Sequence, residues 1–219
     1  MQIVIQPSRE IVVSVPTRYS ESQIKDFLVR KSAWILRKLK ALKDSAQEYA
    51  KDTKSQKGCF YLGKFFPLQY FQTDTKWGKI DFEEEKLSVY IPRRVAAQDQ
   101  AFYVREFLLK WFKARATVVL NERISQYSTR MGVVPAEVHI RSARRLWGSC
   151  HPVKRILHFN WKVLMAPLDT LDYVVVHELC HIKVPNHSRE FWDLVRKYAG
   201  DFKRHHAWLR SNGHRLVLP

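Results

Sequence analysis

The feature that most constrains this chain is residues 171–182, which are apolar on nearly every side of a helix. Three consecutive valines lie within it, and a helix of this kind is stable only when it is buried. Yet His177, Glu178 and His181 belong to the same stretch. Buried polar groups are costly unless they have partners, so the fold must provide something that satisfies all three side chains.

These three polar residues form an HExxH motif. His177 and His181 are four residues apart, so on a helix they share one face and lie roughly 6 Å apart along the axis. Two imidazoles at this spacing can bind one tetrahedral zinc ion, and Glu178 then stands beside the open position as a general base. The motif predicts metal-assisted hydrolysis with Zn2+ as the cofactor.

A third metal ligand is expected just after this helix. The helix should end near Val184, because Pro185 disfavours helical geometry in the residue before it. A turn there and a second helix beginning near Ser188 would bring His187 back toward the first helix. We expect His187 as the third ligand; its spacing equals that of the metzincin motif, although Val184 replaces the glycine of that motif. The acidic alternatives are Glu190, Asp193 and Asp201.

Several separate segments occur in the order of one known family. They are Trp34, residues 61–63, 89–92, 144–150, 157–161 and 165–167, the helix that ends HELCH, and residues 186–188 and 191–192. Together they resemble the YgjP-like metallopeptidase domain, a predicted zinc hydrolase group related to the SprT and WLM proteases. The resemblance implies zinc ligands at His177, His181 and His187, with Glu178 catalytic. Leu146 and His151 depart from the family pattern.

The remaining pattern predicts an α+β, zincin-like fold in which helices, including the HExxH helix, pack on a small sheet. Alternating or β-branched runs predict strands at 3–5, 11–15, 59–71, 79–91, 138–141 and 156–159. Helical periodicity predicts helices at 21–46 and 99–131. We expect a β-rich N-terminal region with one helix at 1–97 and a zincin-like metal-binding domain at 98–219.

Cysteine content and hydropathy bear on where the protein is found. Cys59, Cys150 and Cys180 are an odd number without CxxC spacing, which is typical of a reduced intracellular chain. There is no run of eighteen apolar residues and no charged-then-apolar leader, so we expect neither a membrane span nor a signal peptide. These features predict a cytoplasmic protein that does not bind membranes.

The charge is the second functional indication. Lys and Arg number 38 against 21 acids, a formal net charge of +17, which attracts polyanions. Arg141, Arg144 and Arg145 precede Trp147, and basic residues crowd the C-terminal tail. This pattern predicts weak, salt-dependent nucleic-acid binding, and a solvated basic surface explains it equally well.

Three functions follow from these observations. The first is a zinc-dependent metallopeptidase that cleaves a peptide or protein, using a zinc-bound water and Glu178 as the base. The second is metal-dependent hydrolysis of nucleotides or other phosphate compounds, which the charge favours, although P-loop glycines and a carboxylate-rich two-metal set are absent. The third is a nucleic-acid-binding protein with a structural zinc, in which Glu178 would have no use.

Sequence alone does not choose the group that stabilises the oxyanion; a further histidine or Tyr198 could do so. The remaining histidines, including the neighbours His205 and His206, are expected at the surface, because adjacent residues on a helix point in different directions.

Overall fold

The computed structural model describes residues 1–5, 11–52, 57–83, 86–143 and 146–219. The chain forms two compact units, Met1–Ser55 and Gln56–Pro219. In the first unit, β1 (Gln2–Ile5) and β2 (Ile11–Ser14) lie where strands were predicted and pair antiparallel, and α1 (Glu21–Asp52) is longer than expected. The predicted division at residue 97 stays a prediction. Within the described ranges, no helix is long and apolar enough to cross a membrane.

The second unit is a mixed α+β arrangement of small sheets and helices. Its strands are β3 (Gly58–Tyr61), β4 (Lys64–Thr73), β5 (Lys79–Glu83), β6 (Lys86–Pro92), β7 (Glu137–Arg141), β8 (Gly148–His151) and β9 (Ile156–Asn160). Its α-helices are α2 (Gln100–Met131), α3 (Leu168–Lys183), α4 (Arg189–Ala199) and α5 (Phe202–Asn212). Short 3-10 helices are Ala97–Asp99, Trp161–Met165 and Gly213–Arg215.

The four-stranded sheet has the order β3-β4-β6-β5, with β4 and β6 parallel. The runs predicted as single strands at 59–71 and 79–91 are each divided between two strands, so those predictions were wrong in length. In the first run, Leu62 and Gly63 have φ angles of 47° and 83°. Two successive positive φ values make a tight hairpin turn, which ends β3 and starts β4.

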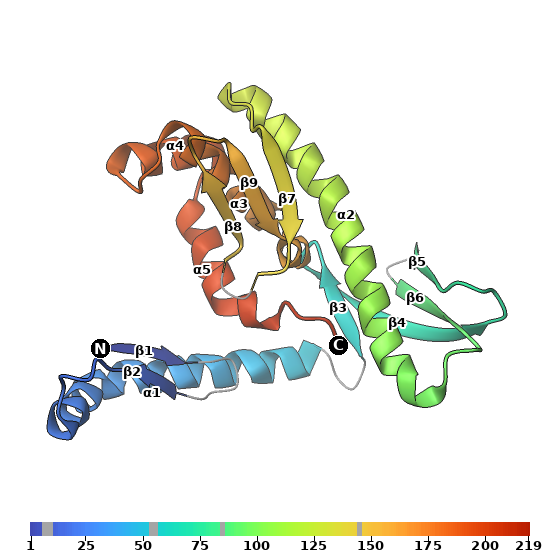
Figure 1. The fold of residues 1–219 in the computed structure, drawn as a ribbon, viewed down its shortest axis with the longest axis horizontal. Helices are drawn as coiled ribbons and strands as arrows, with labels where there is room; N and C mark the ends of the chain where they lie inside the picture. The colour runs from blue at the N-terminus through green and yellow to red at the C-terminus, as the bar shows by residue number, and fades with distance from the viewer. Residues whose placement is uncertain (6–10, 53–56, 84–85, 144–145) are drawn as a thin grey trace. The chain divides into compact units, whose positions relative to one another are not determined.

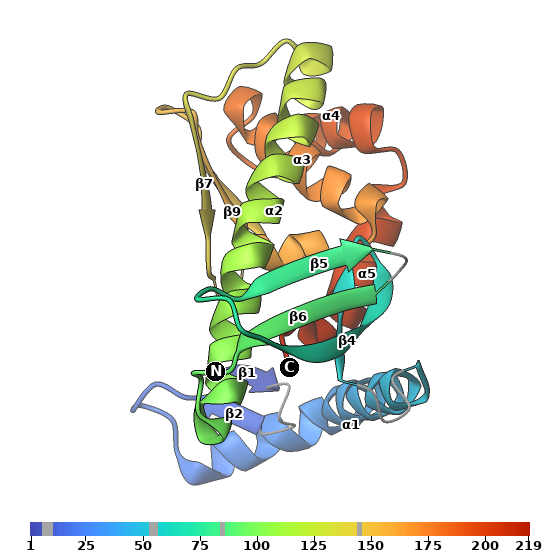
Figure 2. The same cartoon turned by 90° about the vertical axis from the view of Figure 1, so that its right-hand side faces the viewer.

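Helix α2 runs along the length of the second unit (Figures 1 and 2). The four-stranded sheet lies beside its N-terminal half, and the three-stranded sheet and α3 lie beside its C-terminal half. One stripe of the helix is buried at intervals of three or four residues: Val104, Leu108, Phe112, Ala116, Leu120, Ile124, Tyr127 and Met131. Gly132, with a φ of 61°, ends the helix as predicted.

The three-stranded sheet has the order β7-β9-β8. Strands β7 and β9 confirm the strands predicted at 138–141 and 156–159. Strand β8 was not predicted, because glycine, serine and cysteine do not form the β-branched, alternating pattern typical of strands. It is an edge strand of this sheet, and it packs against α3, the helix that carries the HExxH motif.

Hydrogen bonds to the rest of the second unit hold α3 at both ends. Just before its start, in the 3-10 helix Trp161–Met165, the carbonyl oxygens of Leu164 and Met165 accept hydrogen bonds from the amide groups of Leu62 and Gly63, at 2.8 and 3.2 Å. At its end, Nζ of Lys183 donates to the carbonyl of Met131, the last residue of α2, at 2.7 Å. The predicted buried helix is therefore present, and both of its ends are fixed.

Candidate metal centre

After α3 the chain reverses direction at the predicted place, between Val184 and Ser188. Val184 leaves the helix in an extended conformation, with φ −127° and ψ 98°, directly before Pro185. Ser188 then caps α4, since its hydroxyl accepts a hydrogen bond from the amide of Phe191 at 3.4 Å. His187 immediately precedes this cap, so the turn places its ring beside the histidines of α3.

The structure brings His177, His181 and His187 together. One ring nitrogen from each lies within 4.8 Å of those of the other two. Nε2 of His187 is 3.2 Å from Nε2 of His177. Two nitrogens bound to one tetrahedral zinc at about 2.05 Å would be about 3.3 Å apart, so this spacing fits a shared ion. The alternative acids Glu190, Asp193 and Asp201 lie outside this cluster.

The surroundings of the three histidines orient their rings and favour the neutral form of His177, both of which suit metal binding. Nδ1 of His181 lies 3.3 Å from the carbonyl oxygen of Val184, an arrangement that orients the ring and leaves Nε2 for a metal. Phe191 is fully buried and packs against all three rings, with centroid distances of 4.4 to 4.9 Å. Burial lowers the pKa of His177 to about 3, which favours the neutral imidazole that metals require. Three nitrogen donors of this kind fit zinc.

Glu178 is buried, with only 5% of its surface exposed, beside strand β8. A Cβ atom on Gly148 would lie 2.6 Å from Oε1 and 2.7 Å from Cγ of Glu178, so a larger residue at position 148 would displace the Glu178 side chain from its present position. Burial raises the pKa of Glu178 to about 8. A nearby metal cation favours the charged form and would lower that pKa again.

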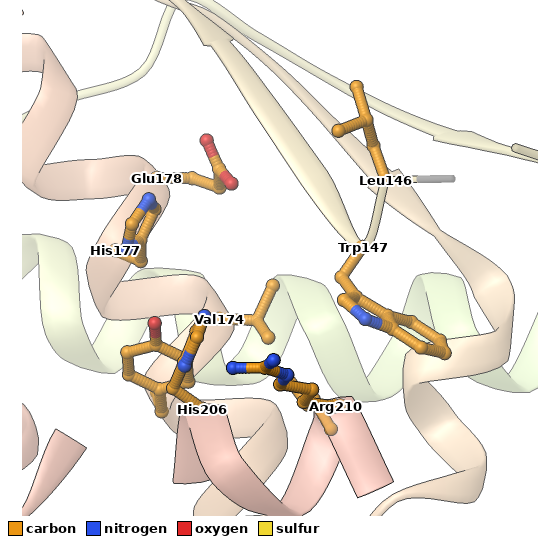
Figure 3. A pocket seen from close by; sticks show the side chains of 9 residues that line it. Leu146, Trp147, Val174, His177, Glu178, His206 and Arg210 are labelled. Atoms are coloured by element: carbon orange, nitrogen blue, oxygen red, sulfur yellow. The ribbon is translucent and has the colours of Figure 1, made fainter. Parts of the chain in front are cut away.

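A cavity of about 320 Å³ opens next to His177 and Glu178 (Figure 3). Its walls come from the segment before β8, from α3 and from α5. The lining residues are Leu146, Trp147, Tyr173, Val174, His177, Glu178, His206, Leu209 and Arg210. Sequence reasoning left His206 among several histidines that could stabilise the oxyanion and did not assign Arg210 to the site, although their four-residue spacing indicates a shared helix face. Tyr198 is not among the lining residues.

The two neighbouring histidines of α5 have different environments. His206 is exposed and lines the cavity. His205 is only 8% exposed, so the expectation that it lies at the surface was wrong. Its Nδ1 lies 3.2 Å from the hydroxyl of Thr170, and its ring stacks on Tyr173 at a centroid distance of 6.0 Å. A hydroxyl partner and an aromatic neighbour on α3 explain this burial.

Comparison with known proteins identifies the class and then the family. A family model described as "YgjP-like, metallopeptidase domain" matches residues 1–212, so the protein is a metallohydrolase with a metallopeptidase domain. The chain belongs to the YgjP-like metallopeptidase domain family. Comparison with curated proteins gave no match.

Among solved structures, the crystal structure of the metallopeptidase zymogen of Pyrococcus abyssi abylysin is 21% identical, with a TM-score of 0.37. The match covers 42% of this chain and 95% of that chain. A likeness this partial adds nothing to the assignment.

The comparisons give no support to nucleic-acid binding. Arg141 is exposed at the end of β7. Arg144 and Arg145 lie outside the described residues, so the basic cluster predicted before Trp147 is described only at its edges.

Proposed function

We propose that the protein is a zinc-dependent metallopeptidase of zincin-like type, in which His177, His181 and His187 hold the ion. The observation that carries this proposal is the 3.2 Å separation between Nε2 of His187 and Nε2 of His177, since two neutral imidazoles at this distance suit a shared tetrahedral ion. When bound, zinc supplies Lewis acidity that lowers the pKa of water and polarises the carbonyl of the substrate.

Glu178 is the general base in this mechanism. It follows the ligand His177 directly on α3, and it lines the same cavity. Its carboxylate takes a proton from the attacking water and passes it to the nitrogen of the leaving amine. Burial raises its pKa and a cation lowers it. Because the two effects oppose each other, the carboxylate can accept and release a proton near neutral pH.

Strand β8 supports an extended peptide as the substrate. It pairs with β9 along one edge, and in the described part of the chain no strand pairs with its other edge. An exposed edge can accept a peptide as an additional strand through backbone hydrogen bonds. Because β8 packs against α3 and Gly148 lies beside Glu178, a peptide on this edge would run past the proposed base.

Two variants of the full chain test this proposal. Glu178→Gln is nearly isosteric, so we expect it to keep zinc but to lose about 100- to 10,000-fold in the rate of hydrolysis of an unfolded protein such as casein. His187→Ala removes a ligand, so we expect loss of zinc as well as activity. Zinc content is measured by mass spectrometry, and activity by release of peptides.

His139→Ala is the matched control, because His139 is a partly exposed histidine on β7 outside the cluster. It should keep both zinc and activity. Activity above about a tenth of wild type in Glu178→Gln would show that this carboxylate is not the base. Full zinc retention by His187→Ala would show that the third ligand is another residue.

A further inference from the structure

Helix α5 adds a positively charged group to the cavity beside the proposed metal centre. His206 and Arg210 are four residues apart, so they share one face of the helix, and both line the cavity together with Leu209. In Figure 3, His206 and Arg210 extend from α5 on the side of the cavity opposite Glu178. The cavity therefore has one wall that carries the proposed reaction chemistry and another that carries a guanidinium.

The charges that line this cavity are unevenly distributed. Glu178 is the one carboxylate among its lining residues, and Arg210 is the one permanently charged cation. In the described part of the chain, Arg210 has no hydrogen bond or ion pair, whereas its neighbour Arg204 pairs with Asp169 and Arg196 pairs with Asp193. A guanidinium matches the planar geometry of a carboxylate or the oxygens of a phosphate. Arg210 is thus free to bind an anionic group of a ligand.

The space between the two walls is apolar and small. Leu146, Trp147, Val174 and Leu209 line it. The indole of Trp147 packs on the turn after α5, since a Cβ on Gly213 would lie 2.5 Å from its Cζ2 atom. About 320 Å³ is close to the lower end of the roughly 300–1,000 Å³ of small-ligand sites. One or two residues of a peptide would fill it.

We propose that Arg210, with His206 beside it, binds the terminal carboxylate of a peptide substrate. The apolar walls then receive the last side chain, and the amide bond before it reaches His177 and Glu178. This inference rests on the proposed function and specifies it as removal of C-terminal residues. Water supplies a hydroxyl to the carbonyl carbon, the C–N bond breaks, and the leaving amine takes the proton. The products are a shortened peptide with a new carboxylate and a free amino acid or dipeptide.

The first test compares N-acetylated peptides that end in a free carboxylate with the same peptides ending in an amide. We expect the zinc-loaded wild type to prefer the free acid in kcat/KM. Arg210→Gln should lower kcat/KM for the acid about 10- to 100-fold, the range for a lost hydrogen bond to a charged group, and leave the amide unchanged. Arg204→Gln, an exposed arginine of the same helix outside the cavity, should keep the full preference.

Direct binding provides a second readout that does not depend on turnover. Calorimetric titration of zinc-loaded Glu178→Gln with N-acetyl-leucine and with its amide should show tighter binding of the acid. Adding Arg210→Gln should abolish that difference. Equal binding of acid and amide, or a preference that survives Arg210→Gln, would overturn the inference.

The remaining outcomes separate this inference from the proposed function. Cleavage within long peptides with no preference for a free C-terminus would leave the metallopeptidase intact and reject the carboxylate site. Phosphate shares the chemistry of a carboxylate, so nucleoside triphosphates form the last arm of the test. Hydrolysis of these compounds alone, reduced by Arg210→Gln, would reject both the peptide substrate and the carboxylate assignment.

Discussion

Two Arg–Asp pairs link helix α3 to neighbouring helices, and the two pairs differ in geometry and in exposure to solvent. On the side of α2, Arg123 binds both oxygens of Asp172, with Nε at 2.6 Å, and Tyr127 donates to the same carboxylate at 3.1 Å. On the side of α5, Arg204 lies 3.6 Å from Asp169. The side chains of the first pair are 19% and 13% exposed, and those of the second 75% and 51%.

This difference separates structural from functional roles around the site. A buried, bidentate pair leaves an uncompensated charge when it is broken, whereas an exposed pair is screened by water and contributes little. The side of α3 toward α2 therefore fixes the helix that carries the histidines and Glu178. On the α5 side, the exposed pair contributes less, and that helix presents the groups that we propose contact the substrate.

The largest effect should come from breaking the buried pair. Asp172→Asn keeps the shape of the side chain but leaves Arg123 unbalanced, so we expect the free energy of unfolding to fall by about 3 kcal/mol. Unfolding in urea, with zinc removed by a chelator, measures it. Asp169→Asn is the matched control and should change the stability little. Equal losses in both variants would remove the distinction between the two sides.

An intermediate effect is expected at His205, a buried residue of α5 that contacts α3. His205→Ala removes the hydrogen bond to Thr170 and the stacking on Tyr173, so we expect a loss of about 2 kcal/mol in the same urea titration. His205→Phe retains an aromatic ring and should recover part of that loss. A loss as large as that of Asp172→Asn would mean that α5 is as firmly attached as α2.

The smallest effect is expected at the exposed pair. Arg204→Ala removes the partner of Asp169 at a solvated position, so the stability should change by less than about 1 kcal/mol. The difference from wild type should shrink further at high salt, because salt screens exposed charges. A salt-independent loss above this range would show that the pair is not simply a surface contact.

The sequence predicted the local features of the site and missed the non-local ones. The spacing of His177 and His181, the stop before Pro185 and the cap at Ser188 all depend on residues a few positions apart. By contrast, β8 becomes a strand because β9 pairs with it, and this contact leaves no periodic pattern in Gly148–His151. His206 and Arg210 belong to the cavity only because α5 packs against α3. The ligand roles and the base remain predictions.

The hairpin turn at Leu62-Gly63 has a consequence for how the site assembles. A Cβ on Gly63 would lie 2.9 Å from Cα of Pro167, so this turn rests on the start of α3 from about a hundred residues away along the chain. The contact between Gly63 and Pro167 closes a loop about ten times as long as the one between His177 and His187. Closing the longer loop costs about 2 kcal/mol more in chain entropy. Bringing the three histidines together therefore costs little chain entropy, whereas the orientation of their helix depends on contacts between distant parts of the chain.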